Sequence, residues 1–245
     1  KRGAAFSKAK VVNSAYQPNA DISEEDDSKS RYYMKARGIY NIKLAAFDTE
    51  ESEHIVTNDL DFDSEHRVYI LKTTITQTIG QLFVLAQGGI YIPGDEFEFA
   101  PVDCVFTHFP ADEDKTLDLG RLGEECKRFK EIFDGAGDSS LILLNETFST
   151  TSFEEGYYIA RDSVRAILTK GTRTIYNTHM HKLGFDVDEM NEGHTEGKVY
   201  SLIVHNEGCQ RSYKIEIAPP AGKSYASDIA EKYGVTYDML VNKEK

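Results

Sequence analysis

The sequence predicts an α/β fold with a mainly parallel sheet flanked by helices. Four consecutive apolar residues, Leu141–Leu144, run into Asn145 and Glu146, as in a strand that is buried on both faces of a parallel sheet. Apolar residues then recur at helical period in the segments on either side of this run. Two further apolar strands flank Asn206-Glu-Gly208, which predicts a hairpin added antiparallel to the sheet.

The first half of the chain alternates between predicted strands and one long helix. We expect strands at 40–47, 54–62 and 67–71, followed by a helix over 75–86 that ends at Gly88-Gly89. The stripe of this helix consists of Ile75, Ile79, Leu82, Phe83 and Ala86. A short strand is expected at 90–92.

The second half repeats the alternation. A helix is predicted over 122–133 and closed by Gly135, and a second one runs from Phe153 to Lys170 with Gly171 as its C-cap. Strands are expected at 141–144, 174–178, 199–204 and 212–217, and two short helices near 225–233 and 237–241. Alternating strands and helices with an antiparallel addition indicate an α/β protein.

Composition excludes several classes of protein. The chain has 245 residues, of which 40% are hydrophobic and 28% charged, so it can bury a substantial core. No apolar run approaches the ~20 residues that span a bilayer, so we expect a cytoplasmic protein without a membrane partner. The net charge of −13 argues against this segment being the main nucleic-acid surface. Three widely spaced cysteines predict neither disulfides nor a zinc site.

A carboxylate and a histidine are predicted at the carboxyl ends of two strands. Glu146 follows the strand 141–144, and His179 follows the strand 174–178. Ligands of open α/β sheets bind outside the carboxyl ends of the strands. The pair therefore predicts phosphoryl-transfer chemistry on a nucleotide.

Lys72-Thr73-Thr74 lies directly between a predicted strand and a predicted helix. A phosphate-binding loop has a lysine and a hydroxyl residue in this place, for the phosphates and for Mg²⁺. The glycines that precede such a lysine are absent here. Either a loop of the natural protein is missing from this sequence, or the motif is lost; the direct strand-to-helix junction is sterically awkward and favours the first explanation.

Taken in order, these segments resemble the ATPase domain of MutS-type DNA mismatch repair proteins. The resemblance is carried by Thr57-Asn58-Asp59, by Val68 to Gly80, and by Pro101 to His108. It continues in Leu141 to Ser152, in Thr178-His179-Met-His-Lys-Leu183, and in Lys223-Ser-Tyr-Ala-Ser227. Each motif alone is weak, but the set covers residues 40–240 in the order of the family.

The resemblance implies an ABC-type P-loop ATPase that dimerises, with each ATP held between one subunit's P-loop and the other's signature loop. By position, Lys72, Thr73, Thr74 and Asn58 bind the nucleotide, Thr73 and Asn145 associate with Mg²⁺, and Glu146 polarises the attacking water. His179 senses the γ-phosphate. ATP and Mg²⁺ are the implied cofactors, and no other metal site is expected. The implied organisation is the end of a preceding helical region over 1–35, an ATPase core over 36–218 and a C-terminal helical segment over 219–245.

Two departures from the family pattern suggest a paralogue with slow hydrolysis. Asn145 stands where the family has aspartate, which removes a negative charge near Mg²⁺. The serine-threonine signature is missing, and Gly120 and Arg121 take its place at a helix start, where we expect them to contact the partner's nucleotide. DNA binding is expected through regions of a longer parent protein.

Three alternatives remain. A degenerate nucleotide-binding fold that serves only as a dimerisation scaffold would explain Asn145 and the missing loop. Another ABC-type ATPase, of chromosome maintenance or transport, would share the core motifs. A metal site built from His179 and His181 with His194 or Asp186 has weak spacing and no cysteine.

Overall fold

The computed structural model describes residues 5–12, 31–46, 55–72, 74–110, 120–207, 210–220, 231 and 233–241. Two larger sheets and a short two-stranded ribbon make up its β structure. Thr73, the predicted helix near 225–233 for the most part, and the segment Lys223–Ser227 lie outside these residues.

The larger sheet has six strands and is mainly parallel. Its spatial order is β12-β11-β5-β10-β9-β8, and every neighbouring pair is parallel except the β11–β12 hairpin. The bounds in that order are Gln210–Ile217, Lys198–Glu207, His66–Leu71, Arg173–Asn177, Leu141–Asn145 and Val105–His108. The α/β fold, the parallel sheet and its antiparallel addition are thus confirmed.

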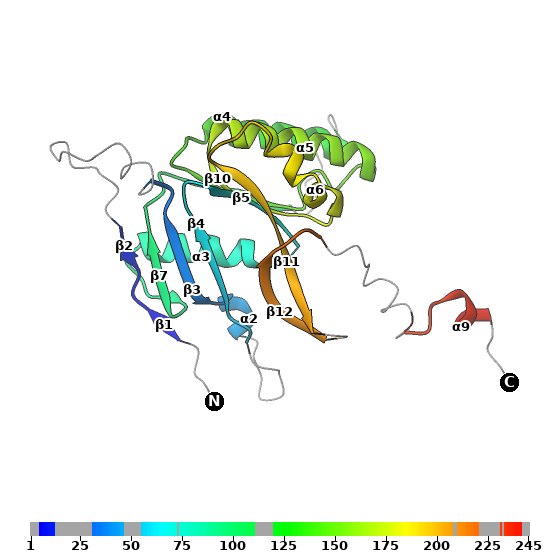
Figure 1. Cartoon of the computed structure of the whole chain (residues 1–245), viewed down its shortest axis with the longest axis horizontal. Helices are drawn as coiled ribbons and strands as arrows, with labels where there is room; N and C mark the ends of the chain where they lie inside the picture. The colour runs from blue at the N-terminus through cyan, green and yellow to red at the C-terminus, as the bar shows by residue number, and fades with distance from the viewer. Residues whose placement is uncertain are drawn as a thin grey trace.

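Helices cover both faces of this sheet (Figure 1). The helix α3 (Ile75–Gln87) lies on one face, and α4 (Gly120–Gly135) and α5 (Phe153–Lys170) lie on the other. In β9, Leu141 and Leu143 join the core on the α3 side, while Ile142 and Leu144 join the core under α4 and α5. This alternation explains why all four residues are apolar.

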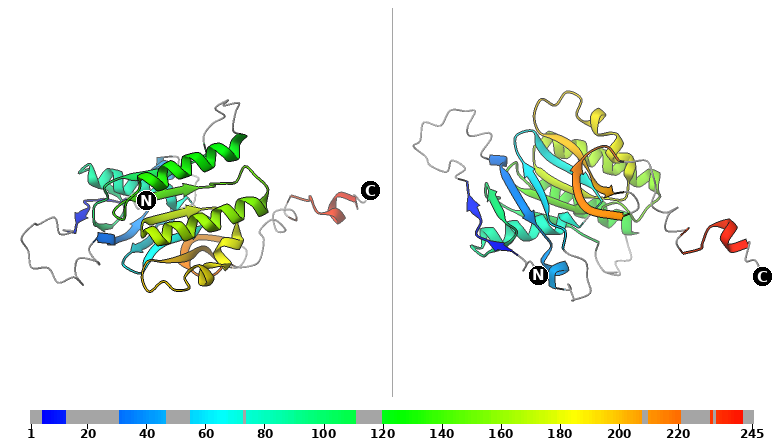
Figure 2. Two further views of the ribbon diagram at one scale, coloured as in Figure 1. Left: turned by 90° about the horizontal axis from the view of Figure 1, so that it is seen from above. Right: turned by 60° about the horizontal axis from the view of Figure 1, so that its bottom comes forward.

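A second sheet of four strands packs against the free side of α3 (Figure 2). Its order is β2-β7-β3-β4, and β3 runs antiparallel to both neighbours. The bounds are Lys10–Val11, Glu96–Phe99, Met34–Ile39 and Asn58–Phe62. A two-stranded ribbon pairs β1 (Phe6–Ser7) with β6 (Ile92–Pro93). Phe83 of α3 packs edge-on against Phe97 and Phe99 of β7, so α3 is the shared layer between the two sheets.

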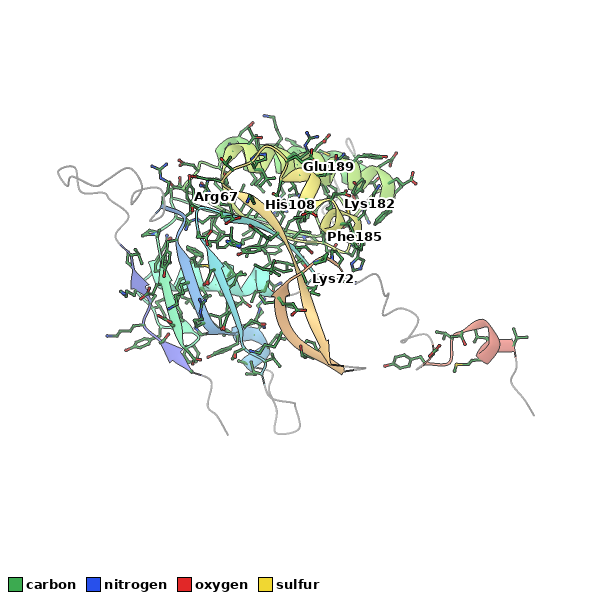
Figure 3. The ribbon with its side chains drawn as sticks, viewed as in Figure 1. Arg67, Lys72, His108, Lys182, Phe185 and Glu189 are labelled. Atoms are coloured by element: carbon green, nitrogen blue, oxygen red, sulfur yellow. The ribbon has the colours of Figure 1, made fainter. Side chains whose placement is uncertain are left out.

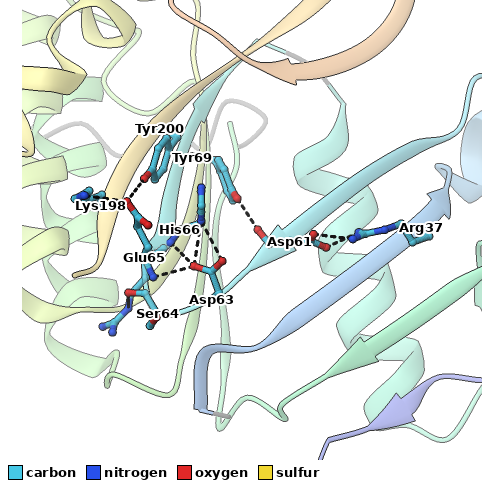
Figure 4. Close-up of polar contacts among 10 residues, drawn as sticks. Arg37, Asp61, Asp63, Ser64, Glu65, His66, Tyr69, Lys198 and Tyr200 are labelled. Carbon is cyan, nitrogen blue, oxygen red and sulfur yellow. Dashed lines mark hydrogen bonds and ion pairs between the residues drawn. The ribbon is translucent and has the colours of Figure 1, made fainter. Parts of the chain in front are cut away.

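The turn between β4 and β5 joins the two sheets and is fixed by charged groups (Figure 4). The Asp63 carboxylate accepts hydrogen bonds from the backbone N–H groups of Glu65 and His66 and from the His66 ring. These bonds lower the pKa of Asp63 although burial opposes them. Glu65 in turn accepts bonds from Lys198 and Tyr200 of β11, at 2.8 Å each. The turn therefore anchors β5 to its neighbour β11.

Two short helices follow β10. They are α6 (His181–Phe185) and α7 (Val187–Met190), and both contact β11. Gly184 of α6 is closely packed: a Cβ there would lie 2.5 Å from Cγ of Pro220 and 2.9 Å from Oγ of Ser201. Only glycine fits at this position.

Several predicted elements differ from the structure. The strand expected at 40–47 is wrong, because β3 ends at Ile39 and α2 (Ile42–Ala46) follows. The described residues 5–12 hold two short strands rather than the end of a helical region. The helix α9 (Tyr237–Val241) agrees with the expectation. The division of the chain into three parts stays a prediction. None of the helices described here is long and apolar enough to cross a membrane.

Candidate functional site

Three parallel strands end at one level and bring the predicted site residues to one edge of the sheet. Asn177 of β10 pairs with Leu71 of β5 on one side and with Asn145 of β9 on the other. The next residues continue this alignment, since the N–H of Thr178 donates to Leu71 O and the N–H of Glu146 donates to Asn177 O, both at 2.8 Å. Lys72, Glu146 and His179 consequently emerge together at the carboxyl ends of their strands.

Glu146 and His179 contact each other directly. The Glu146 Oε2 atom lies 2.6 Å from Nδ1 of the His179 ring and 3.2 Å from the His179 backbone nitrogen. The contact with a carboxylate oxygen requires a proton on Nδ1, so Nε2 is the nitrogen that can face a substrate. Both side chains keep a share of their surface open, 29% for Glu146 and 48% for His179. The pair can therefore reach a substrate.

The backbone of Glu146 is left-handed, with φ of 52°, and Phe148 also has a positive φ of 65°. For residues other than glycine such conformations cost about 1–3 kcal/mol each, and they concentrate at functional sites. The turn that carries Glu146 is thus held by its surroundings rather than by its own preference.

A cavity of about 230 Å³ opens beside this edge. It is lined by Lys72, Thr74, Thr76, Gln77, Asn145 and Asn177. The exposed Lys72 directly follows β5, and the next three lining residues are the N-cap of α3, Thr74, and two residues of its first turn. The N-terminus of α3 has no side-chain cap and no acidic residue in its first turn. Free backbone N–H groups at such a helix end favour an anion.

The cavity suits a phosphate group. Small-molecule sites usually measure about 300–1,000 Å³, so this one is too small for a whole nucleotide. Thr76 is 1% exposed, and its buried hydroxyl finds no hydrogen-bond partner within the described part of the chain. A buried hydroxyl without a partner is costly unless a ligand satisfies it. The wall of the cavity thus combines the positive charge of Lys72 with a hydroxyl that lacks a partner among the described residues.

The donors at the edge are also of the kind that Mg²⁺ prefers. Amide and carboxylate oxygens are hard ligands, and Mg²⁺ typically takes one or two of them together with waters and substrate phosphates. Asn145 supplies an amide oxygen, although Oδ1 already accepts from Nδ2 of Asn177 at 2.5 Å. Glu146 supplies a carboxylate. No group of three or more histidine, cysteine or acidic residues within the described ranges could hold a metal ion, so the histidine metal site is not supported.

The remaining predicted residues lie elsewhere. Asn58 bonds to the backbone of β12, to Tyr213 O at 3.1 Å and to Ile215 N at 2.8 Å, and does not line the cavity. Gly120 and Arg121 begin α4, and neither belongs to the cavity wall. β5 ends at Leu71 and α3 begins at Ile75, so three residues of the sequence separate this strand from this helix.

Some residues of the site were not predicted. Thr76, Gln77 and Asn177 line the cavity. Asn177 could have been found from the sequence because it ends the strand next to the one that ends at Asn145. Thr76 could have been found because it is a polar residue between the apolar residues of a helix. His181 lies close enough to Lys72 and His179 for both to lower its pKa, after the larger effect of burial.

His108 is the last residue of β8 (Val105–His108) and is buried (Figure 3). Its Nδ1 atom lies 3.2 Å from Oγ1 of Thr147, the residue after Glu146. Burial, and then the nearby Arg128, lower the pKa of His108 from the ordinary 6.5. Below pH 6.5 the His108 side chain therefore binds protons more readily in the unfolded chain than in the folded one. Its contribution to the free energy of unfolding is complete above pH 6.5. The contribution is lost as the pH falls toward the lower pKa of His108 in the folded protein. When the pH is lowered from about 7.5 to about 5.5, we expect the free energy of unfolding to fall less in His108→Asn than in the parent.

Equilibrium unfolding in denaturant, measured at both pH values, tests this expectation. His194→Asn, in the partly exposed loop after α7, is the matched control and should follow the parent. An equal loss of stability in the parent and in His108→Asn would show that His108 is not the acid-sensitive group.

Comparison with known proteins identifies the family. MutS domain V matches residues 71–244. Among relatives, "Endonuclease MutS2" of Caldicellulosiruptor bescii is 29% identical over 66% of this chain and 22% of its own length. "DNA mismatch repair protein MutS" of Chlorobium phaeovibrioides is 29% identical over 69% of this chain and 21% of its own length. The "DNA mismatch repair protein MutS" of Haloquadratum walsbyi reaches 33% identity over 52% of this chain and 14% of its own.

The chain thus spans about a fifth or less of the length of these relatives. Domain V of the family is an ATPase domain, and the match covers most of the six-stranded sheet together with the edge that holds Lys72, Glu146 and His179. The chain belongs to the MutS domain V family.

Proposed function

We propose that this chain binds ATP with Mg²⁺ at the carboxyl edge of β5, β9 and β10 and hydrolyses it. The observation that carries the proposal is the common register of the three strands, which collects Lys72, Glu146 and His179 at one edge. Lys72 neutralises charge on the phosphates, and the hydroxyl groups of Thr73 and Thr74 donate to the nucleotide. Asn145 and Thr73 associate with Mg²⁺, which would offset phosphate charge when bound.

In this proposal Glu146 orients the attacking water and takes up its proton. Its carboxylate also holds His179 with Nδ1 protonated, so that the ring faces the terminal phosphate with its other nitrogen or, once protonated, as a second donor. The chemistry needs little more than positioning and charge compensation, as is general for phosphoryl transfer.

We further propose an ABC-type arrangement in a homodimer. One subunit's cavity is open at the sheet edge and smaller than a nucleotide, so a second surface is needed to enclose ATP. Gly120 and Arg121 at the start of α4 are the candidates for that surface, acting on the partner's nucleotide. DNA would be bound by other parts of a longer protein, as the names of the relatives suggest.

Removal of the Lys72 ammonium tests the binding site. Hydrogen bonds to charged groups contribute about 1.5–3 kcal/mol, so Lys72→Ala should weaken ATP binding about tenfold to a hundredfold. Lys127→Ala, on the exposed side of α4, is the control and should bind ATP like the parent. Titration with a fluorescent ATP analogue gives both constants. Equal affinities in the parent and Lys72→Ala would refute the site.

A dimerisation scaffold without catalysis is the second candidate. It is favoured by the short junction at residues 72–74, which lacks the backbone N–H groups of a glycine-rich loop. If the parent chain binds ATP but does not hydrolyse it, the protein is a dimerisation scaffold and not an ATPase.

A further inference from the structure

Side chains of the helix α4 contact the turn that carries Glu146. Two of its residues, Glu146 and Phe148, are left-handed. Such a conformation persists only where the surrounding structure enforces it. The position of the Glu146 carboxylate therefore depends on whatever holds residues 146–150, and the proposed function makes that position the one that matters.

Glu125, in the second turn of α4, makes a charged contact with this turn. The Thr150 hydroxyl donates to Oε2 of Glu125 at 3.0 Å. Burial raises the pKa of the Glu125 carboxyl, and its nearness to the Thr150 hydroxyl and to the backbone N–H groups of Phe148 and Thr150 opposes that rise. The carboxylate thus faces donor groups of residues 148–150.

Apolar contacts and further polar contacts also fix the position of this turn. Phe148 is 1% exposed, and its ring lies 5.5 Å edge-on from Phe129, one turn along α4 from Glu125. Oγ1 of Thr147 lies 3.2 Å from Nδ1 of His108, and the Tyr176 hydroxyl donates to Thr147 O at 2.7 Å. Among these partners of the turn, Glu125 alone contributes a carboxylate.

We propose that Glu125 is a positioning residue for ATP hydrolysis: its carboxylate holds the turn 146–150 in the left-handed conformation that keeps Glu146 on His179. Glu125 itself touches neither substrate nor the reacting atoms. Its loss leaves the donors of the turn without their acceptor and lets Glu146 relax toward an ordinary backbone conformation. The inference rests on the proposed role of Glu146.

Steady-state kinetics of the full 245-residue chain test the proposal. Misplacement of a reacting group by about 1 Å can cost about a hundredfold, so Glu125→Ala should lower kcat about tenfold to a hundredfold with KM for ATP unchanged. Glu125→Gln keeps one acceptor oxygen for Thr150 and should stay within about threefold of the parent. Glu131→Ala, an exposed acid on the same helix, should leave kcat unchanged.

Thr150→Val removes the donor from the other side of the contact. It should lower kcat in the same direction, and adding it to Glu125→Ala should cause no further loss, because both changes break one interaction. If Glu125→Ala does not fold, Thr150→Val and Glu125→Gln decide. A kcat in Thr150→Val equal to that of the parent, or no rescue by glutamine, overturns the proposal.

The outcomes separate this inference from the proposed function. If the parent hydrolyses ATP, Glu146→Gln does not, and Glu125→Ala matches the parent, only the role of Glu125 is overturned. If the parent itself lacks hydrolysis, the proposed function and the role of Glu125 are both overturned.

Discussion

Replacement of Glu146 by glutamine is expected to lower the rate of ATP hydrolysis by about two to three orders of magnitude, as is typical for loss of a general base. Glutamine has the same length and keeps an oxygen that can accept from His179, so the geometry of the pair survives. It cannot take a proton from water. ATP binding should therefore stay close to that of the parent while turnover stops.

Glu154→Gln is the matched control, because Glu154 is exposed in the first turn of α5, close in sequence to Glu146. It should hydrolyse ATP at the parental rate. Phosphate release gives kcat, and equilibrium binding of ATP gives the affinity. Parental turnover in Glu146→Gln would exclude Glu146 as the base and return the reaction to some other group at the sheet edge.

Completion of the phosphate loop is expected to have an effect of similar size on affinity. A segment of the pattern Gly-x-x-x-x-Gly inserted between Leu71 and Lys72 would add backbone N–H groups around the phosphates, in front of the existing lysine and threonine. Two such charge-assisted hydrogen bonds, at about 1.5–3 kcal/mol each, raise ATP affinity about a hundredfold or more. Isothermal titration with ATP and Mg²⁺ measures the change.

An insertion of the same length with alanine at both glycine positions is the control, because alanine resists the left-handed backbone that the loop requires. It should bind ATP like the parent. Identical affinities for the two insertions would mean that the cavity beside Lys72 does not receive phosphate. Tandem mass spectrometry of the tryptic peptide after Arg67, from the protein's natural source, shows whether such a segment already lies there.

The sequence predicted the parallel sheet because buried strands carry a strong signal. Leu141–Leu144 had to be apolar on both faces, and the stripe of α3 is buried at every predicted position. The segment 40–47 misled because a short apolar run can be strand or helix, and packing decides between them. The alternating Glu96–Phe99, by contrast, carried a readable strand pattern that we did not use.

The residues at the edge of the sheet could be predicted from the ends of the strands alone, because the residues that follow parallel strands lie at the same edge. Glu125 and His108 could not be predicted in this way. Each contacts the turn 146–150 from a different element, and no spacing along the chain encodes such a contact. The left-handed backbone of Glu146 was equally invisible, since glutamate carries no conformational signature of its own.

The close fit of Gly184 against Pro220 has a mechanical consequence. The helix α6 begins two residues after His179, and Pro220 is the last residue described before the C-terminal part of the chain resumes at 231. A side chain at position 184 would therefore have to displace Pro220 or shift α6. The close packing links the position of the helix that follows His179 to that of the segment that follows β12.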